Sequence, residues 1–127
     1  MKKIGLITTN RLLAQSLNMA LGVLPNLELE LIQLQKIEQA LIDAEVLQID
    51  IAVIDLVCCS DHDNDAALTL CTNLRRQLPF CKILMLVAQE NKIGKHLAMD
   101  AKVHENIDDF IFYDTSLDYL ITKFVDL

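Results

Sequence analysis

Residues 51–65 have the sequence IAVIDLVCCSDHDND, in which four apolar residues lead directly into one aspartate, Asp55. An unbroken apolar run of this length is typical of a central parallel strand that is covered on both faces. The polar residues behind it predict a loop at the end of that strand. An aspartate in this position serves as a phosphate acceptor, a metal ligand, a catalytic acid or a helix cap, and its neighbours in the fold determine which.

Strand and helix signals alternate along the whole chain around this segment. Apolar runs typical of strands occupy residues 3–8, 27–34, 51–54, 82–87 and 110–113. Apolar residues at helical spacing fall within 13–24, 37–44, 68–78, 91–103 and 117–124. Within 91–103 the spacing predicts that Ile93, Leu97 and Ala101 face inward. Thr115 with Asp118 predicts a capping box for the last helix.

Five βα units with short connections predict an α/β fold, a flavodoxin-like (βα)5 doubly wound parallel sheet with right-handed crossovers. Apolar and polar residues alternate in 27–34, so one face of that strand meets water and we expect the strand at an edge. This favours the strand order 2-1-3-4-5. The sequence contains no internal repeat or linker, and residues 1–127 are expected to form one domain.

The composition excludes several classes of function. The 127 residues are 53% hydrophobic, with 11 basic against 18 acidic side chains and a net charge of −7. This balance repels a phosphate backbone, so direct binding to nucleic acid is not expected. No apolar run is long enough to span a bilayer, and the start of the chain lacks a signal-peptide core. We therefore expect a cytoplasmic protein without membrane association.

Four cysteines raise the question of a metal site. Cys58, Cys59, Cys71 and Cys81 are not spaced as zinc ligands, and we expect reduced thiols without metal. A redox role for the adjacent Cys58–Cys59 pair stays open. The acidic residues within 60–65 resemble the start of a calcium loop, but the glycine and glutamate that such a loop needs further on are absent.

Ligands of such sheets bind at the carboxyl ends of the strands, where the strand order reverses. Thr8 and Thr9 follow the first strand there, and Asp55, Val87 and Tyr113 follow or end the third, fourth and fifth. The three glycines of the chain lie elsewhere, so no loop is expected to cradle a nucleotide or flavin phosphate.

With AVIDL at the third strand and five βα units over its whole length, the chain resembles a response-regulator receiver domain of two-component signalling. The resemblance implies that Asp55 occupies the phosphoacceptor position. In that family an acidic pair after the first strand holds Mg²⁺, a Ser or Thr after the fourth bonds the phosphoryl group, and a Lys after the fifth pairs with it. Here those positions are Thr8 and Thr9, Val87 and Tyr113, so the chain resembles a degenerate receiver, or pseudo-receiver.

These replacements remove the charges on which phosphoryl transfer depends. A phosphoryl donor brings several negative charges to an anionic Asp55, and neutralising them is most of the catalysis. Threonine hydroxyls are poor Mg²⁺ ligands, so we expect no cofactor, weak or absent Mg²⁺ binding and no catalytic residue. The expected protein is a phosphorylation-independent signalling domain and not an enzyme. Two alternatives stay open, an atypical receiver that is still phosphorylated and a small flavodoxin-like enzyme.

The resemblance also implies that the domain acts by protein–protein contact. Receiver-like domains expose the face made by the fourth helix, the fifth strand and the fifth helix. In this sequence that face includes Lys95, His96, Met99, Tyr113 and Tyr119. We expect the partner to be another signalling protein or an effector domain of the same protein, and a homodimer through this face is a further expectation.

Overall fold

A computed structural model of the chain describes residues 2–8, 10–23, 28–34, 36–56, 61–88, 90–112 and 116–127, without the side chains of 61–65. The strands in this part are β1 (Lys2–Ile7), β2 (Leu29–Leu34), β3 (Ile51–Asp55), β4 (Lys82–Val87) and β5 (Asp109–Phe112). The helices are α1 (Arg11–Gly22), α2 (Ile37–Leu47), α3 (Asp61–Gln77), α4 (Lys92–Val103) and α5 (Leu117–Asp126).

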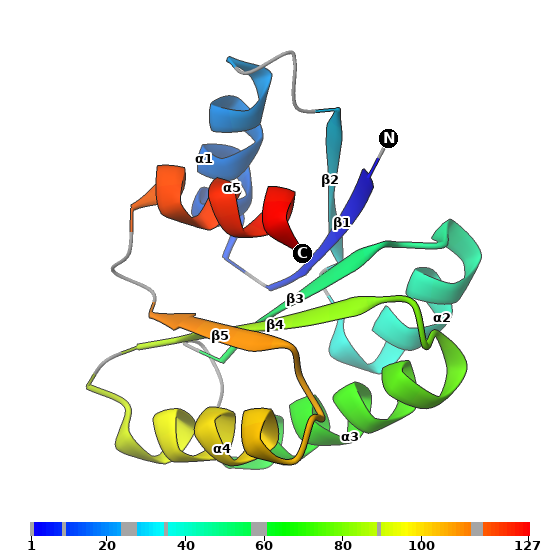
Figure 1. Cartoon of the computed structure of the whole chain (residues 1–127), viewed down its shortest axis with the longest axis vertical. Coiled ribbons are helices and arrows are strands. Elements are labelled where there is room, and N and C mark those ends of the chain that lie inside the picture. Colours follow the sequence, from blue (N-terminus) through cyan, green and yellow to red (C-terminus); the bar gives the residue numbers. More distant parts are fainter. Residues whose placement is uncertain are drawn as a thin grey trace.

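The strands form one parallel sheet in the order β2-β1-β3-β4-β5, which confirms the predicted doubly wound α/β fold. Helices α1 and α5 cover one face of the sheet, and α2, α3 and α4 cover the other (Figure 1). Strand β2 lies at an edge, as its alternating pattern predicted. None of the helices in the described ranges is long and apolar enough to cross a membrane.

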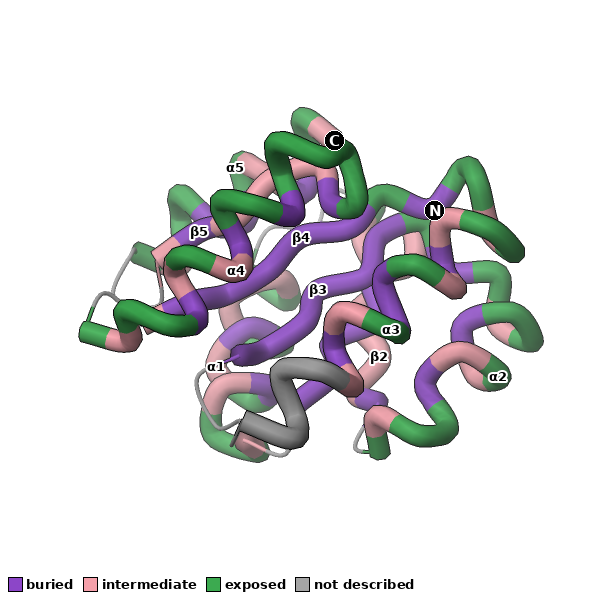
Figure 2. Tube along the Cα trace, turned by 90° about the horizontal axis from the view of Figure 1, so that it is seen from below, coloured by how far each residue is buried: buried purple, intermediate pink, exposed green. Residues whose placement is uncertain are grey.

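Alternate residues of the central strands feed two separate apolar cores. Ala52 and Ile54 of β3 pack toward α2, α3 and α4, whereas Ile51 and Val53 pack toward α1 and α5. All five residues of β3 are buried, so the strand lies at the centre of the molecule (Figure 2). This explains the unbroken apolar run that precedes Asp55, because neither face of β3 meets water.

Helix α4 has a different inward face from the one that the sequence predicted. Ile93 is 61% exposed, and the buried residues are Gly94, Ala98 and Ala101. The side chain of Asn91 caps the helix by accepting a hydrogen bond from Gly94 N at 3.0 Å. A Cβ atom at position 94 would lie 2.7 Å from the side-chain amide nitrogen of Asn91, so a larger residue there would displace the capping side chain. The prediction for Ile93 was therefore wrong, and that for Ala101 is confirmed.

The structure identifies the side chains that cap α1 and α5. Asn10 caps α1, as its Oδ1 accepts a hydrogen bond from Leu13 N at 3.2 Å. Helix α5 is capped by Ser116, whose Oγ accepts from Tyr119 N at 3.2 Å, and the predicted cap Thr115 lies outside the described residues. A hydroxyl directly before the first helical residue meets the free N–H groups of the first turn, which is why the cap falls at Ser116.

Candidate functional site

The parallel register brings the predicted site positions to one edge of the sheet. Ile7 pairs with Ile54 and Asp55 pairs with Leu86, so Thr8, Asp55 and Val87 follow one another across β1, β3 and β4. Backbone hydrogen bonds continue past the strand ends, from Leu56 N to Leu86 O at 2.9 Å and from Thr8 N to Leu34 O at 3.2 Å. The positions predicted from chain order are therefore adjacent in space.

Thr8 and Asp55 are in direct contact at this edge. The Thr8 hydroxyl donates a hydrogen bond to Asp55 Oδ2 at 2.6 Å. Thr8 is 5% exposed and Asp55 is 4% exposed, and within the described ranges they are the two polar residues that are buried. A donor–acceptor distance of this size is typical of a charge-assisted bond between a hydroxyl and an ionised carboxylate. The hydroxyl therefore stabilises the buried carboxylate of Asp55.

The backbone around Thr8 orients its hydroxyl. Asn10 N donates to Thr8 Oγ1 at 3.0 Å, so the oxygen accepts one hydrogen bond while it donates another to Asp55. Gln33 Nε2, from the edge strand β2, donates to Thr8 O at 3.2 Å. A hydroxyl proton that is held toward Asp55 in this way leaves the Thr8 oxygen poorly disposed to bind a cation.

Val87 brings no polar group to the site. It is fully buried and belongs to the apolar core between the sheet and helices α2, α3 and α4. Its side chain therefore offers no hydrogen bond to a phosphoryl group. Two further predicted positions, Thr9 and Tyr113, lie outside the described residues, and the structure brings together only Thr8, Asp55 and Val87 of the predicted set.

The described part of the chain holds no cluster of three or more His, Cys, Asp or Glu side chains suited to a metal ion. Cys71 and Cys81 are buried thiols, and Cys58 and Cys59 lie outside the described residues. Burial raises the pKa of Cys71 to about 12. Burial, with a smaller contribution from Asp50, raises the pKa of Cys81 to about 11. Neither buried thiol is disposed to ionise for metal binding or redox chemistry near neutral pH.

A second cluster, which the sequence analysis missed, lies on the edge strand β5. Asp109 accepts hydrogen bonds from Lys102 of α4 at 2.9 Å and from Lys123 of α5 at 2.6 Å. The next amide along the chain, Phe110 N, also donates to Asp109 Oδ1, at 2.9 Å. One carboxylate thus joins both flanking helices to β5. The sequence signal for this cluster would have been Asp109 itself, a charged residue at the start of an apolar strand.

Opposing effects determine the ionisation of this cluster. Burial alone would raise the pKa of Asp109, but hydrogen bonds from Lys123, Lys102 and Phe110 N outweigh it and lower the pKa below its ordinary value. The hydrogen bond to Asp109 raises the pKa of Lys123 in turn. The ion pairs at Asp109 are therefore fully formed at neutral pH.

Strand β5 and its flanking helices also carry an aromatic surface with a hollow. The rings of Phe110 and Phe112 meet edge to face with centroids 5.9 Å apart, and Lys95 Nζ lies 5.4 Å from the Phe112 centroid. His96, Met99 and Tyr119 are exposed nearby on α4 and α5. The hollow has a volume of about 350 Å³ and is lined by Lys102, Asp109, Phe110, Ile111, Phe112 and Tyr119.

Comparison with known proteins supports the fold. No family model and no curated protein matches the chain. Among solved structures, an adenylate cyclase from Rhodopirellula baltica matches with a TM-score of 0.78 and 14% identity, over 97% of this chain and 84% of that one. A CheY-like receiver domain protein from Methanospirillum hungatei matches with a TM-score of 0.76 and 15% identity, over 99% and 92% of the two chains.

A response regulator from Burkholderia pseudomallei, described with a phosphorylated aspartic acid, a calcium ion and citrate, matches with a TM-score of 0.72 and 20% identity. The match covers 96% of this chain and 65% of that chain. Identities this low are informative about fold alone, and most of these neighbours are response regulators or their receiver domains. The chain has the fold of a CheY-like response-regulator receiver domain.

Proposed function

We propose that the chain is a cytoplasmic receiver-like signalling domain of a two-component or phosphorelay pathway that acts by protein contact, without phosphorylation of Asp55. The observation that carries this proposal is the hydrogen bond of 2.6 Å from the Thr8 hydroxyl to Asp55 Oδ2. An uncharged donor stabilises the carboxylate at the position where the receiver family uses a carboxylate-bound metal ion. No enzymatic activity is proposed.

Charge is the main reason. Transfer of a phosphoryl group to Asp55 would gather several negative charges at a residue that is 4% exposed. A hydroxyl supplies one hydrogen bond but no positive charge, and Val87 supplies neither. Such transfers depend on metal ions and cationic side chains that neutralise the developing charge. The arrangement of Thr8, Asp55 and Val87 supports a site that is stable as a carboxylate and unreactive toward phosphoryl donors.

One alternative has a specific observation in its favour. Asp55 ends β3 at the edge where ligands of such sheets bind, and the Burkholderia response regulator of the same fold is described with a phosphorylated aspartic acid and a calcium ion. An atypical receiver that is still phosphorylated is therefore the second candidate. A small enzyme of this fold is the weakest candidate, because none of the three glycines of the chain lies at a strand-to-helix turn where a phosphate-binding loop would need one.

Phosphorylation at Asp55 is directly measurable. We would incubate the protein and Asp55→Asn with acetyl phosphate and Mg²⁺ and record intact masses. In parallel, amide NMR spectra would be recorded during a titration with beryllofluoride, a phosphoryl mimic. The proposal expects no added phosphoryl mass and no shifts around Asp55. A phosphoryl adduct that is present in the wild type and absent in Asp55→Asn establishes the working-receiver alternative.

We propose that the surface of α4, β5 and α5 is where the partner binds. Asp109 holds both helices on β5 through Lys102 and Lys123, so the surface is ordered before it binds. Aromatic rings around a hollow of about 350 Å³ supply the kind of anchor that dominates protein interfaces. A signalling protein or an effector domain is the proposed occupant, with a second copy of the chain as the competing one.

A further inference from the structure

Phe80 is the most exposed of the large apolar side chains in the described residues, with 92% of its surface accessible. It follows α3 and precedes β4 in the short turn that includes Pro79. This turn lies at the amino ends of the strands, whereas Asp55 lies at their carboxyl ends. The fold does not use the ring for its own packing, so a full aromatic side chain is left in water at this end of the molecule.

A hollow lies directly beside this ring. Its volume is about 370 Å³, and it is lined by Lys2, Asp50, Ile51, Phe80, Lys82 and Leu127. Protein sites for small ligands span about 300–1,000 Å³, so this hollow is at the small end of that range and suits a single side chain. Leu127 contributes apolar surface, while the two lysines and the aspartate contribute charge at the rim.

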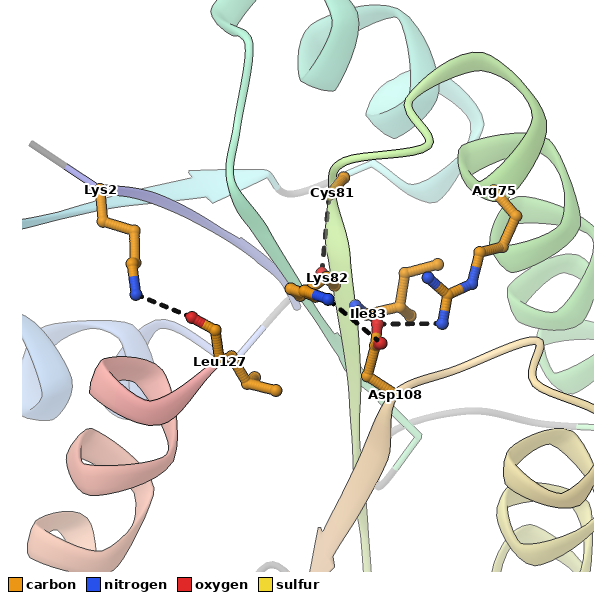
Figure 3. Close-up of polar contacts among 7 residues, drawn as sticks. All are labelled: Lys2, Arg75, Cys81, Lys82, Ile83, Asp108 and Leu127. Carbon is orange, nitrogen blue, oxygen red and sulfur yellow. Dashed lines mark hydrogen bonds and ion pairs between the residues drawn. The ribbon is translucent and has the colours of Figure 1, made fainter.

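Internal contacts hold the rim in place on both sides (Figure 3). Lys2 Nζ donates to the backbone oxygens of Phe124 at 3.2 Å and Leu127 at 2.9 Å, at the end of α5. On the other side, Lys82 Nζ lies 4.0 Å from Asp108 Oδ1. A rim whose side chains are already ordered loses little conformational entropy when an occupant enters.

Asp108 is itself fixed by two further contacts. Its Oδ2 is 3.0 Å from Arg75 Nη2, and it accepts a hydrogen bond from Ile83 N at 2.7 Å. The Lys82 side of the hollow is thereby connected to both α3 and β4. The hollow is therefore a built feature of the amino end and depends on several elements of the fold.

We propose that this end of the sheet binds a second copy of the chain across a two-fold axis, with the Phe80 ring of each copy in the hollow of the other. A two-fold contact requires a projection and a matching recess on the same patch, and Phe80 and the hollow meet this requirement because they are adjacent. Buried aromatic anchors of this kind provide much of the stability of protein interfaces.

The charges favour a second copy over a partner of one sign. The chain has a net charge of −7, so most of its surface repels another copy. The rim of the hollow holds Lys2 and Lys82 against a single carboxylate, Asp50. Both signs on one patch allow a lysine of one copy to face a carboxylate of the other.

This contact goes beyond the proposed function and is independent of it. It uses neither Asp55, at the opposite ends of the strands, nor the surface of α4, β5 and α5. Two copies joined at their amino ends would leave both of their partner surfaces accessible. The two dimer hypotheses therefore predict sensitivity to different substitutions.

Sedimentation velocity over a range of protein concentrations tests the proposal. We expect the wild type to dimerise and Phe80→Ser to weaken dimerisation by at least about tenfold. Because Phe80 is exposed, the variant should fold normally, which circular dichroism would verify. Leu12→Ser is the matched control, since Leu12 is 74% exposed at the start of α1 and far from the hollow, and it should dimerise like the wild type.

A second variant separates this contact from the α4–β5–α5 surface. Tyr119→Ser removes an exposed aromatic side chain from that surface, and the proposal expects it to dimerise as the wild type does. The proposal is overturned if the wild type stays monomeric up to about 1 mM. It is equally overturned if Phe80→Ser dimerises unchanged, or if Tyr119→Ser abolishes dimerisation while Phe80→Ser does not. Each of these results leaves the phosphorylation test untouched.

Discussion

Thr8 and Asp55 are separated by 47 positions in the sequence, and the Thr8 hydroxyl donates a hydrogen bond of 2.6 Å to the Asp55 carboxylate. The Asp55 carboxylate, at the end of β3, is therefore stabilised by a hydroxyl that directly follows the neighbouring strand β1. The same hydroxyl oxygen accepts from Asn10 N, so the contact also fixes the turn between β1 and α1. This double role makes Thr8 the most informative position for substitution.

Thr8→Val should lower the free energy of unfolding by about 2 kcal/mol, because it removes one donor from a buried carboxylate and one acceptor from Asn10 N. Thr8→Ser keeps the hydroxyl and should cost less than about 1 kcal/mol. Urea unfolding followed by circular dichroism measures both values. Equal midpoints for the two variants would mean that the hydrogen bond does not contribute to stability.

Asp55→Asn should change stability by less than about 1 kcal/mol, since the amide oxygen can still accept the hydrogen bond from Thr8. Its binding to any partner of the domain should be unchanged if Asp55 is vestigial. Asp55→Ala is the comparison, because it removes the acceptor and should destabilise by about 1–3 kcal/mol. If the asparagine and alanine variants unfold at the same urea concentration, the negative charge itself is needed.

Restoring the four receiver-type residues should recover Mg²⁺ binding. The variant combines Thr8→Asp, Thr9→Asp, Val87→Thr and Tyr113→Lys, which supplies carboxylates for the metal ion beside Asp55. Clustered carboxylates repel one another, so the variant should melt at a lower temperature than the wild type without metal. Millimolar Mg²⁺ should raise its melting temperature by mass action and leave the wild type unchanged. A wild-type protein that Mg²⁺ stabilises as strongly contradicts this prediction.

Asp109→Asn should lower the free energy of unfolding by about 1 kcal/mol at neutral pH, through weaker contacts to Lys102 and Lys123. The folded-state pKa of Asp109 is lowered, so the contribution of its ionised form is complete above the unfolded pKa of about 4. It is lost as the pH falls through the folded pKa. The difference between wild type and Asp109→Asn should therefore shrink toward pH 3 or so.

Urea titrations at neutral and acidic pH measure this difference. Glu30→Gln, a change to an exposed carboxylate on the edge strand β2, is the control and should differ little from the wild type at either pH. If the difference in unfolding free energy between Asp109→Asn and the wild type stays constant with pH, the contribution of Asp109 to stability does not come from its negative charge.

The buried thiols should resist alkylation in the folded protein. Burial raises the pKa of Cys71 to about 12 and that of Cys81 to about 11, so little thiolate is present at about pH 8. Peptide mapping after iodoacetamide treatment should find both modified only after unfolding. Cys58 and Cys59 remain predicted to be reduced and free of metal, and stoichiometric zinc by elemental analysis would contradict this.

The element order and the sheet were predictable because hydropathy reports directly on burial. Strands β3 and β4 are apolar except for one charged residue at an end of each, since both of their faces are covered. The edge position of β2 was predicted correctly, but its expected wet face was not found, because Leu29 and Leu31 pack into one core and Ile32 and Leu34 into the other. The strand ends follow from the parallel order, which is sufficient to predict that Thr8, Asp55 and Val87 lie at the same end of the sheet. Bounds were less predictable, and β1 covers Lys2–Ile7 where residues 3–8 were expected.

Other features depended on contacts between segments that are distant in the sequence. The inward face of α4 was predicted from the spacing of apolar residues, which favours Ile93, whereas the residues buried in the packed structure are Gly94, Ala98 and Ala101. The Asp109 cluster was missed because its two lysines come from different helices. Distances between helices determine both features, and no local pattern encodes those distances.

The sequence by itself determined the order of the βα units and the parallel α/β sheet, because hydropathy and spacing report on burial along each element. That Asp55 takes the acceptor position without its usual helpers stays a prediction from the resemblance to receiver domains. Only the tertiary structure decided that the Thr8 hydroxyl bonds to Asp55, that Asp109 joins α4 and α5, and that Phe80 projects beside a recess. These are relationships between side chains on separate elements, and their geometry exists only once the helices and strands have packed.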